Sequence, residues 1–543
     1  MRLPCLLCLL TQLMPAQPTA AQNPAQNPAQ SPAQSPAQSR ADTPNPFGHT
    51  LEELALAIEK ALNAWELDEA QLLMVQVEAL NLHGLALLHY LQGRMAFQQG
   101  LYAQAVDAFA LAGQEDKPNS FLRLANAAKH FLKTAQPFES EHFVLFVPQG
   151  KQSALAAYIL YTLEAQYEAM SLELAFAPPK KLRVEWASSA PEWAALSGLP
   201  LEKALSPHTA GFCGFGKMVV LSPSAVQGGF AWQNSLAHAY VHCATAQKTR
   251  NQTPPWLQKA LAAYLENHWK SPHPPALPQA DWAALQQYLG ASNTLVLEKK
   301  PGPTANTSPT AQLALAEGFL LAEYLKAQLG PQAFSQLLSI LSQQGNAEHA
   351  IAQLSRMPWP QWKQRFRKAV LARRFPISPQ PQAEKKTSPQ RLHALRLAKL
   401  YASHQHHEAA VYHYAKAQAL PGGELPHVAQ SHAQSLLALS RFEEAERVLA
   451  HAVDERAPAT LWLTLGKLRL HQSQWAKAQQ AFERTLAQHP FLPEVHLGLY
   501  AAASAQNNAT LAKRAQQAAA TLLETSTETV DDMARAFSTP TPP

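Results

Sequence analysis

Three short phrases recur at an almost constant interval in the C-terminal part of the chain. HEAA (407–410), FEEA (442–445) and WAKA (475–478) begin 35 and then 33 residues apart. An interval of about 34 residues is typical of a repeated pair of helices, and such a pair buries its apolar face only by stacking on neighbouring pairs. The interval therefore predicts three or four stacked helix pairs over residues 391–524.

A related pattern occurs nearer the N-terminus, where residues 87–112 read LLHYLQGRMAFQQGLYAQAVDAFALA. Gly93 stands where two helices must approach closely, Gly100 is expected in the turn that follows, and Phe109 falls on the apolar face of the second helix. Both regions resemble tetratricopeptide repeats (TPR) in spacing and in the placement of small residues. We therefore expect TPR-like helices over residues 49–135 as well.

The middle of the chain, residues 138–372, has a different pattern. Three β-favouring runs end in Pro or Ser: HFVLFVP (142–148), KLRVEWAS (181–188) and KMVVLSP (217–223). A helical stretch over 152–174 separates the first two runs, and GFCGFGK (211–217) reads as a glycine-rich turn leading into the edge strand of a cleft. These patterns predict a mostly α chain, with an α+β domain flanked by two blocks of helix pairs.

The remaining segments are read from their composition. Residues 1–21 place one cation, Arg2, before a short apolar run and end in small residues, as a secretory signal peptide does. Residues 22–48 repeat proline every fourth residue and predict a disordered linker rich in Pro, Gln and Ala, and residues 373–390 predict a second linker. The polar stretch 525–543 predicts a disordered tail. We therefore expect an exported protein, periplasmic or extracellular.

The charge balance and the cysteine content limit which partners and which cellular compartment the sequence allows. Lys and Arg number 44 against 39 Asp and Glu, without a basic block, so we expect no nucleic-acid partner. No run of about 18 apolar residues follows the leader, so we expect no membrane span after signal cleavage. Cys213 and Cys243 remain beyond the leader, and the sequence leaves open whether they form a disulfide.

The stretch SLAHAYVHCA (235–244) places His238 and His242 four residues apart in a helix-favouring setting, and PPWLQKALAAYLE (254–266) follows. Together they resemble the gluzincin-type, peptidase MA-like metallopeptidases. In that family a strand precedes a helix bearing L-x-H-E-x-x-H, and a second helix carries P-x-W-L-x-E-G-x-A-x-Y. The resemblance implies a zincin-like domain over 138–372, in a family whose members are often secreted and joined to TPR.

The chain departs from the family at the two positions that carry the chemistry. The family's general base, which activates zinc-bound water, is the glutamate of the first motif, and here that position is Ala239. The family's third zinc ligand lies on the second helix, and here that position is Lys259. Alanine accepts no proton, and a protonated lysine cannot coordinate zinc. We therefore expect a degenerate active site without a catalytic residue, in which His238 and His242 are vestigial metal ligands.

Other carboxylates are weaker candidates for a third ligand. Glu266 shares a helical face with Lys259 but is displaced by about 10 Å along the helix axis, too far for a bond of about 2 Å. Glu164, Glu168 and Glu202 would contribute only if the tertiary structure brought one of them to the histidines. We therefore expect no cofactor, and zinc held by the histidine pair is the alternative.

These features predict an exported, non-catalytic pseudo-metallopeptidase that binds polypeptide partners as a scaffold or adaptor. The concave face of the repeats and the former substrate cleft would be the two docking surfaces. Two alternatives stay open on the sequence alone. One is an active zinc-dependent metallopeptidase with a non-standard third ligand and base, and the other is a purely structural TPR protein whose middle domain is a spacer.

Overall fold

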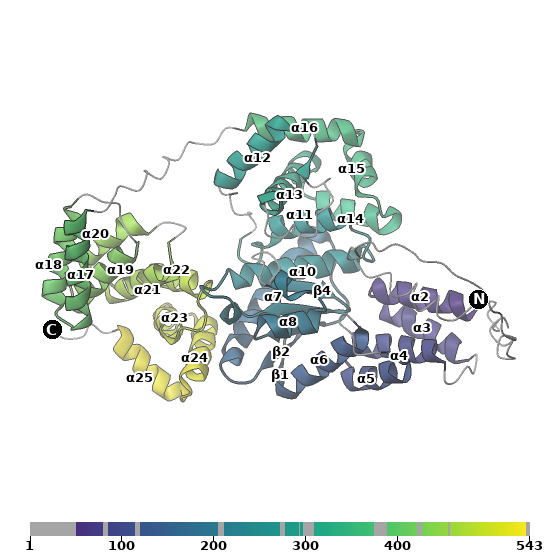
Figure 1. Cartoon of the computed structure of the whole chain (residues 1–543), viewed down its shortest axis with the longest axis horizontal. Coiled ribbons are helices and arrows are strands. Elements are labelled where there is room, and N and C mark those ends of the chain that lie inside the picture. Colours follow the sequence, from purple (N-terminus) through teal and green to yellow (C-terminus); the bar gives the residue numbers. More distant parts are fainter. Residues whose placement is uncertain are drawn as a thin grey trace, which may run out of the picture.

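The computed structural model describes residues 50–79, 85–114, 120–204, 211–271, 277, 279–292, 294–296, 309–373, 388–420, 426–453 and 457–538. The chain is mostly helical with one small mixed sheet, which confirms the predicted mostly α, α+β class (Figure 1). The predicted leader (1–21) and first linker (22–48) lie outside the described residues, as do residues 374–387 of the second linker.

The N-terminal helices pack in pairs joined by short turns. They are α2 (Leu51–Asn63), α3 (Leu67–Glu78), α4 (Ala86–Gln98), α5 (Tyr102–Leu111) and α6 (Phe121–Thr134). A Cβ on Gly93 of α4 would lie 2.6 Å from the ring of Phe109 in α5, so the predicted close approach at Gly93 is confirmed. Gly100 takes a left-handed φ of 78° in the turn between α4 and α5, where the sequence predicted it.

The C-terminal helices form a second series of pairs. They are α17 (Pro389–Ser403), α18 (His407–Gln418), α19 (Pro426–Ala438), α20 (Phe442–Ala452), α21 (Ala459–His471), α22 (Trp475–Leu486), α23 (Pro493–Ala505) and α24 (Ala509–Leu523). The turn inside each pair contains one left-handed residue, at Gln405, Ser440, Ser473 and Asn507, which are 35, 33 and 34 residues apart. The period of the sequence is therefore the period of the helical hairpins.

The expectation of a disordered tail from residue 525 is wrong for most of that segment. Residues Thr527–Ser538 form helix α25. Val530 and Ala534 of this helix are buried in a cluster with Leu497 of α23 and Ala519 of α24. The tail is polar on average, but its few apolar residues fall on one helical face, which is enough to attach it to the preceding pair.

The sheet has the strand order β1-β2-β3-β5-β4. Its strands are β1 (Ala135–Glu139), β2 (Phe143–Pro148), β3 (Leu182–Ala187), β4 (Gly211–Gly214) and β5 (Lys217–Leu221). Strands β2, β3 and β5 are parallel, and β1 and β4 pair antiparallel at the two edges. The GFCG stretch, expected as a turn, is thus itself the edge strand, and the turn is confined to Phe215 and Gly216. Glycine in this strand marks a close approach of another element, which for Gly211 is helix α10.

Helices cover both faces of the sheet. On one face, Val184, Trp186, Met218 and Val220 pack against a core formed by the long helices that follow the sheet strands. On the other face, Val219 and Leu221 pack against the N-terminal helices and α8 (Ala190–Ser197). All of β5 is buried for this reason, and the N-terminal helices share a core with the sheet.

The remaining helices extend the first of these cores. The 3-10 turn η2 (Lys151–Leu155) leads into α7 (Ala156–Leu174), close to the predicted helix over 152–174. The short elements α9 (Leu201–Ala204) and η3 (Pro223–Ala225) flank β4 and β5 in the chain. After the sheet come α10 (Trp232–Lys248), α11 (Pro255–Leu265), α12 (Gln279–Ala291), α13 (Pro309–Leu329), α14 (Ala333–Gln344), α15 (Ala347–Ser355) and α16 (Trp359–Ala372).

The last C-terminal hairpins, α21–α24, share a core with the sheet domain, whereas α17–α20 lie farther from it (Figure 1). The indole N–H of Trp232 in α10 donates to the carbonyl of Leu486 in α22 at 3.0 Å. The hydroxyl of Tyr158 in α7 lies 3.3 Å from Nδ1 of His496 in α23, and both side chains are buried. Within the described ranges, no helix combines the length and the apolar character that crossing a bilayer requires.

Candidate functional site

Helix α10 carries the histidine pair on its half-buried side. Leu236, Ala239, Tyr240 and Cys243 are buried at helical spacing, which fixes the rotation of the helix against the sheet domain. One turn apart, the two Nε2 atoms of His238 and His242 lie 3.2 Å from each other. One imidazole donates to the other, so each ring holds its neighbour in place.

Glu266 closes the other side of His238. Its carboxylate lies 2.9 Å from Nδ1 of His238, and it occupies the position directly after the last residue of α11. From the sequence, Glu266 is displaced by about 10 Å from Lys259 along α11, too far to replace a zinc ligand there. The contact with Nδ1 of His238 does not test that expectation, because Nε2 is the nitrogen that faces His242. Glu266 reaches His238 because α10 crosses α11 with its first histidine near the C-terminal end of α11. Glu266 is therefore part of this cluster, as a hydrogen-bond acceptor for the imidazole.

The electrostatic environment keeps His242 neutral. Burial first, then the electrostatic influence of the neighbouring His238 imidazole and the charge of Lys259, lower the pKa of His242 to about 3, and a hydrogen bond with Gln258 opposes the shift. Lys259, at the position of the family's third ligand, thus acts on His242 as a nearby cation. A lysine in this place repels the same charge that a metal ion would bring.

Ala239 is sealed beneath the edge strand. It is 1% exposed, and a Cβ built on Gly211 of β4 would overlap the Cβ of Ala239 and lie 3.3 Å from the carbonyl oxygen of Ser235. Strand β4 and helix α10 therefore approach at a glycine and an alanine, the two smallest residues. The Cβ of Ala239 therefore packs against the backbone of β4 at Gly211.

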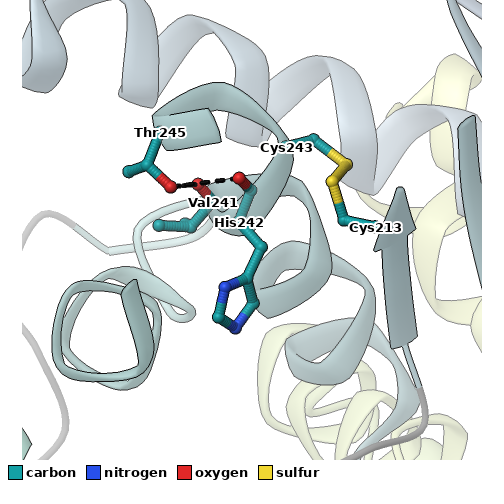
Figure 2. Close-up of a disulfide and its surroundings, with 5 residues drawn as sticks. All are labelled: Cys213, Val241, His242, Cys243 and Thr245. Atoms are coloured by element: carbon teal, nitrogen blue, oxygen red, sulfur yellow. Dashed lines mark hydrogen bonds between the residues drawn. A yellow bond between two sulfur atoms is a disulfide. The ribbon is translucent and has the colours of Figure 1, made fainter. Parts of the chain in front are cut away.

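A disulfide fixes this contact. Cys213 of β4 is joined to Cys243 of α10, with a Cα–Cα distance of 5.6 Å (Figure 2). The imidazole of His242 points away from the disulfide, while the hydroxyl of Thr245 donates to the carbonyl of Val241 at 2.8 Å and to that of His242 at 3.0 Å (Figure 2). The question left open by the sequence is settled in favour of pairing.

The other candidate carboxylates take different places. Glu164 accepts from the backbone N–H of His142 at 2.9 Å and lies 2.7 Å from Nδ1 of the same residue. Glu168 and Glu202 are exposed. Among the described residues, no group of three or more His, Cys, Asp or Glu side chains is placed to hold a metal ion.

The donor set does not fit the zinc of an active gluzincin. Two imidazoles face each other through Nε2, and their separation of 3.2 Å is compatible with two ligands of one cation. Lys259 stands where the resemblance would place a third ligand, and its charge acts on His242. The Glu266 carboxylate lies on Nδ1 of His238, on the far side of that ring from His242. The site resembles a hydrogen-bonded chain more than a coordination sphere.

No family model matches the chain, and a search of curated proteins gives no match. The resemblance to peptidase MA-like proteins therefore rests on residues 236–242 and 254–266, and the geometry around them is the remaining source of functional argument.

Proposed function

We propose that this protein is an exported, non-catalytic relative of gluzincin-type metallopeptidases that binds polypeptide partners. The observation that carries the proposal is the contact between Gly211 and Ala239, which fills the position of the general base with packed backbone and a methyl group. A chain that kept a catalytic function at this place would need space for a carboxylate and for the water it activates.

The order of elements supports the family part of the proposal. Strand β5 is followed by α10, which bears LAHAYVH, and then by α11, which bears the PPWLQKALAAYLE phrase. This is the strand, helix and second helix of the family pattern. Helical hairpins with a period of 33 to 35 residues agree with TPR units on the C-terminal side.

Two surfaces support polypeptide binding. Strand β4 ends the sheet and is half-buried, so its free edge offers backbone groups to an added extended strand. The stacked hairpins α17–α24 provide a second surface of the kind that helical repeats use for partners. Export through the predicted leader agrees with a disulfide that ties β4 to α10, because disulfides persist in oxidising compartments.

A second candidate, a metallopeptidase with unusual ligands, is favoured by two observations at the histidine pair. The Nε2 atoms of His238 and His242 are 3.2 Å apart, and the Nδ1 of His238 already bonds a carboxylate, an arrangement typical of metal-binding histidines. The positive charge of Lys259 near His242 argues against it.

One experiment separates these functions. The purified wild type and the His238→Ala variant are incubated with casein and with a quenched peptide library, with and without added zinc, to measure hydrolysis. In a second measurement, hydrogen exchange of both proteins is followed with and without an excess of unlabelled peptides. We expect no hydrolysis in any sample, and slower exchange at residues 211–214 of both proteins when peptide is bound. Hydrolysis by the wild type that disappears in His238→Ala would overturn the proposal, as would peptides that protect neither β4 nor the hairpins.

A further inference from the structure

A pocket of about 510 Å³ lies where the C-terminal hairpins dock on the sheet domain. Helices α7 and α10 and the segment after α11 form one wall, and α21, α22, α23 and α24 form the other. Its lining combines aromatic and cationic side chains with amides, aliphatic residues and one acid, Glu483. The aromatic and cationic members are Tyr158, Tyr161, Trp269, Trp462, Lys270, Arg484 and Arg514.

Fixed contacts hold the two walls of this pocket together. Besides the hydrogen bond from Trp232 to Leu486, the backbone at Gly229 approaches the carbonyl of Gln488 so closely that a Cβ would overlap it. Gly229 also has a φ of 68°, which favours glycine. The pocket is therefore a built feature of the docked chain, and its shape is set before any ligand binds.

The cations of the pocket outnumber its carboxylates. None of Lys270, Arg484 and Arg514 makes an ion pair with a carboxylate in the part of the chain that the structure describes. The single acid of the wall, Glu483, already accepts a hydrogen bond from Gln479 at 2.8 Å. Three cations therefore face one carboxylate, and an anionic ligand would supply the missing negative charge.

The aromatic side chains of the pocket indicate that a ligand would also have an apolar part. The guanidinium of Arg514 lies 3.9 Å from the ring centre of Tyr161, and that of Arg484 lies 5.8 Å from Trp462. The indole N–H of Trp269 is fixed by the side-chain oxygen of Asn234 at 3.2 Å. Each of the two arginines therefore lies beside an aromatic ring, so a cationic group and an apolar surface are adjacent in the pocket.

We propose that this pocket binds a carboxylate attached to an apolar body, with Arg484 and Arg514 holding the carboxylate and Trp269, Trp462 and Tyr161 holding the apolar part. The planar fork of arginine matches the two oxygens of a carboxylate, and one negative charge suits a wall that also contains Glu483. Such a group is supplied by the C-terminus of a polypeptide or by a small organic acid. The polypeptide source rests on the proposed function, whereas the pocket itself does not.

The test uses the full chain and matched pairs of ligands. The probes are an acetylated hexapeptide ending in phenylalanine and N-acetylphenylalanine, each as the free acid and as the amide, with binding followed by calorimetry and by tryptophan fluorescence. We expect the acids to bind at least about tenfold more tightly than the amides, since a hydrogen bond to a charged group is lost with the carboxylate. Higher salt should weaken the acids more than the amides.

Two double variants complete the test. Arg484→Gln with Arg514→Gln should remove the preference for acids, whereas Lys477→Gln with Lys513→Gln removes equal charge from the same two helices outside the pocket and should keep it. A peptide acid that binds about tenfold more tightly than N-acetylphenylalanine identifies a polypeptide terminus as the source, and equal affinities identify a small acid. Amides that bind as well as acids to the wild type, or equal losses in both double variants, would overturn the proposal. Protection of β4 by peptides is a separate measurement, so the proposed function can stand if the pocket fails.

Discussion

Gly211 of the edge strand lies directly on Ala239 of helix α10, at a distance that leaves no space for a Cβ on the glycine. The contact changes the meaning of the alanine in the histidine motif. Read as chemistry, Ala239 is a missing base that one substitution would restore. As a packing contact, Ala239 and Gly211 allow the helix and the strand to approach closely. The disulfide between Cys213, two residues after Gly211, and Cys243 of the same helix holds the two elements together. The alanine at position 239 therefore has a packing reason that is independent of any catalytic role.

The packing at Gly211 is tested by adding a single methyl group. Gly211→Ala should destabilise the protein by roughly 1–3 kcal/mol, because the methyl overlaps Ala239 and the carbonyl of Ser235 restricts relaxation. The matched control is Gly290→Ala, in helix α12, where a Cβ meets no atom within 4 Å; it should stabilise by about 0.5–1 kcal/mol. Urea unfolding monitored by circular dichroism measures both, and a stabilised Gly211→Ala variant would refute the close packing.

Sequence periodicity was sufficient where the fold depends on local patterns. The close approach at Gly93 and the turn at Gly100 follow from the spacing of small and apolar residues, and the structure has both. The three β-favouring runs became β2, β3 and β5, because apolar residues in short runs bounded by turns have few other solutions. Helix α25 was missed because its polar composition hides a single apolar face.

The candidate site was harder to predict from the sequence, because its geometry depends on how helices and strands cross one another. His238 and His242 were found from their spacing, but Glu266 reaches His238 only through the packing of α10 on α11, which one helical axis cannot reveal. The role of GFCG as an edge strand likewise depends on its pairing with β5 and on the disulfide. The contact between Gly211 and Ala239 could not be predicted either, because it depends on how β4 packs on α10.

The depressed pKa of His242 predicts a loss of stability in mild acid. Its folded-state pKa of about 3 lies below the ordinary value of 6.5, so the unfolded chain binds the proton more tightly between these values and stability falls as the pH drops through this window. When the pH falls from 7 to 5, the free energy of unfolding of the wild type should decrease by up to about 2 kcal/mol more than that of His242→Gln. His427→Gln, which replaces an exposed histidine on α19, serves as the control, and parallel pH curves for wild type and His242→Gln would contradict the prediction.

The disulfide should contribute measurably to stability because it closes a loop with a sequence separation of 30 residues. The Cys213→Ser, Cys243→Ser double variant should unfold about 2–4 kcal/mol more easily than the oxidised wild type, and reductant should shift the wild type in the same direction. Reductant should not change the unfolding free energy of the double variant, so this variant controls for effects of the reductant other than reduction of the disulfide. Peptide mapping without reduction should recover Cys213 linked to Cys243, and free thiols at both positions in protein purified from an oxidising compartment would contradict the pairing.

A buried ionic cluster joins the N-terminal helices to the sheet and gives the last prediction. The carboxylate of Glu185 in β3 lies 2.6 Å from Nζ of Lys217 in β5 and 2.8 Å from Nε of Arg183, and it accepts the hydroxyl of Tyr102 from helix α5. Burial raises the pKa of Glu185, but the charges of Lys217 and Arg183 outweigh it and keep the pKa below its usual value.

Lys217→Met should therefore destabilise the protein by about 3 kcal/mol, since it leaves a fully buried carboxylate with one cation fewer. The loss should appear at the contact between α5 and the sheet, as faster hydrogen exchange in both elements. Lys181→Met is the matched control, because its ion pair with Glu139 at 3.0 Å is exposed on both sides and should contribute less than about 1 kcal/mol. If Lys217→Met were no more destabilising than Lys181→Met, the cluster would not be what attaches the N-terminal helices to the sheet.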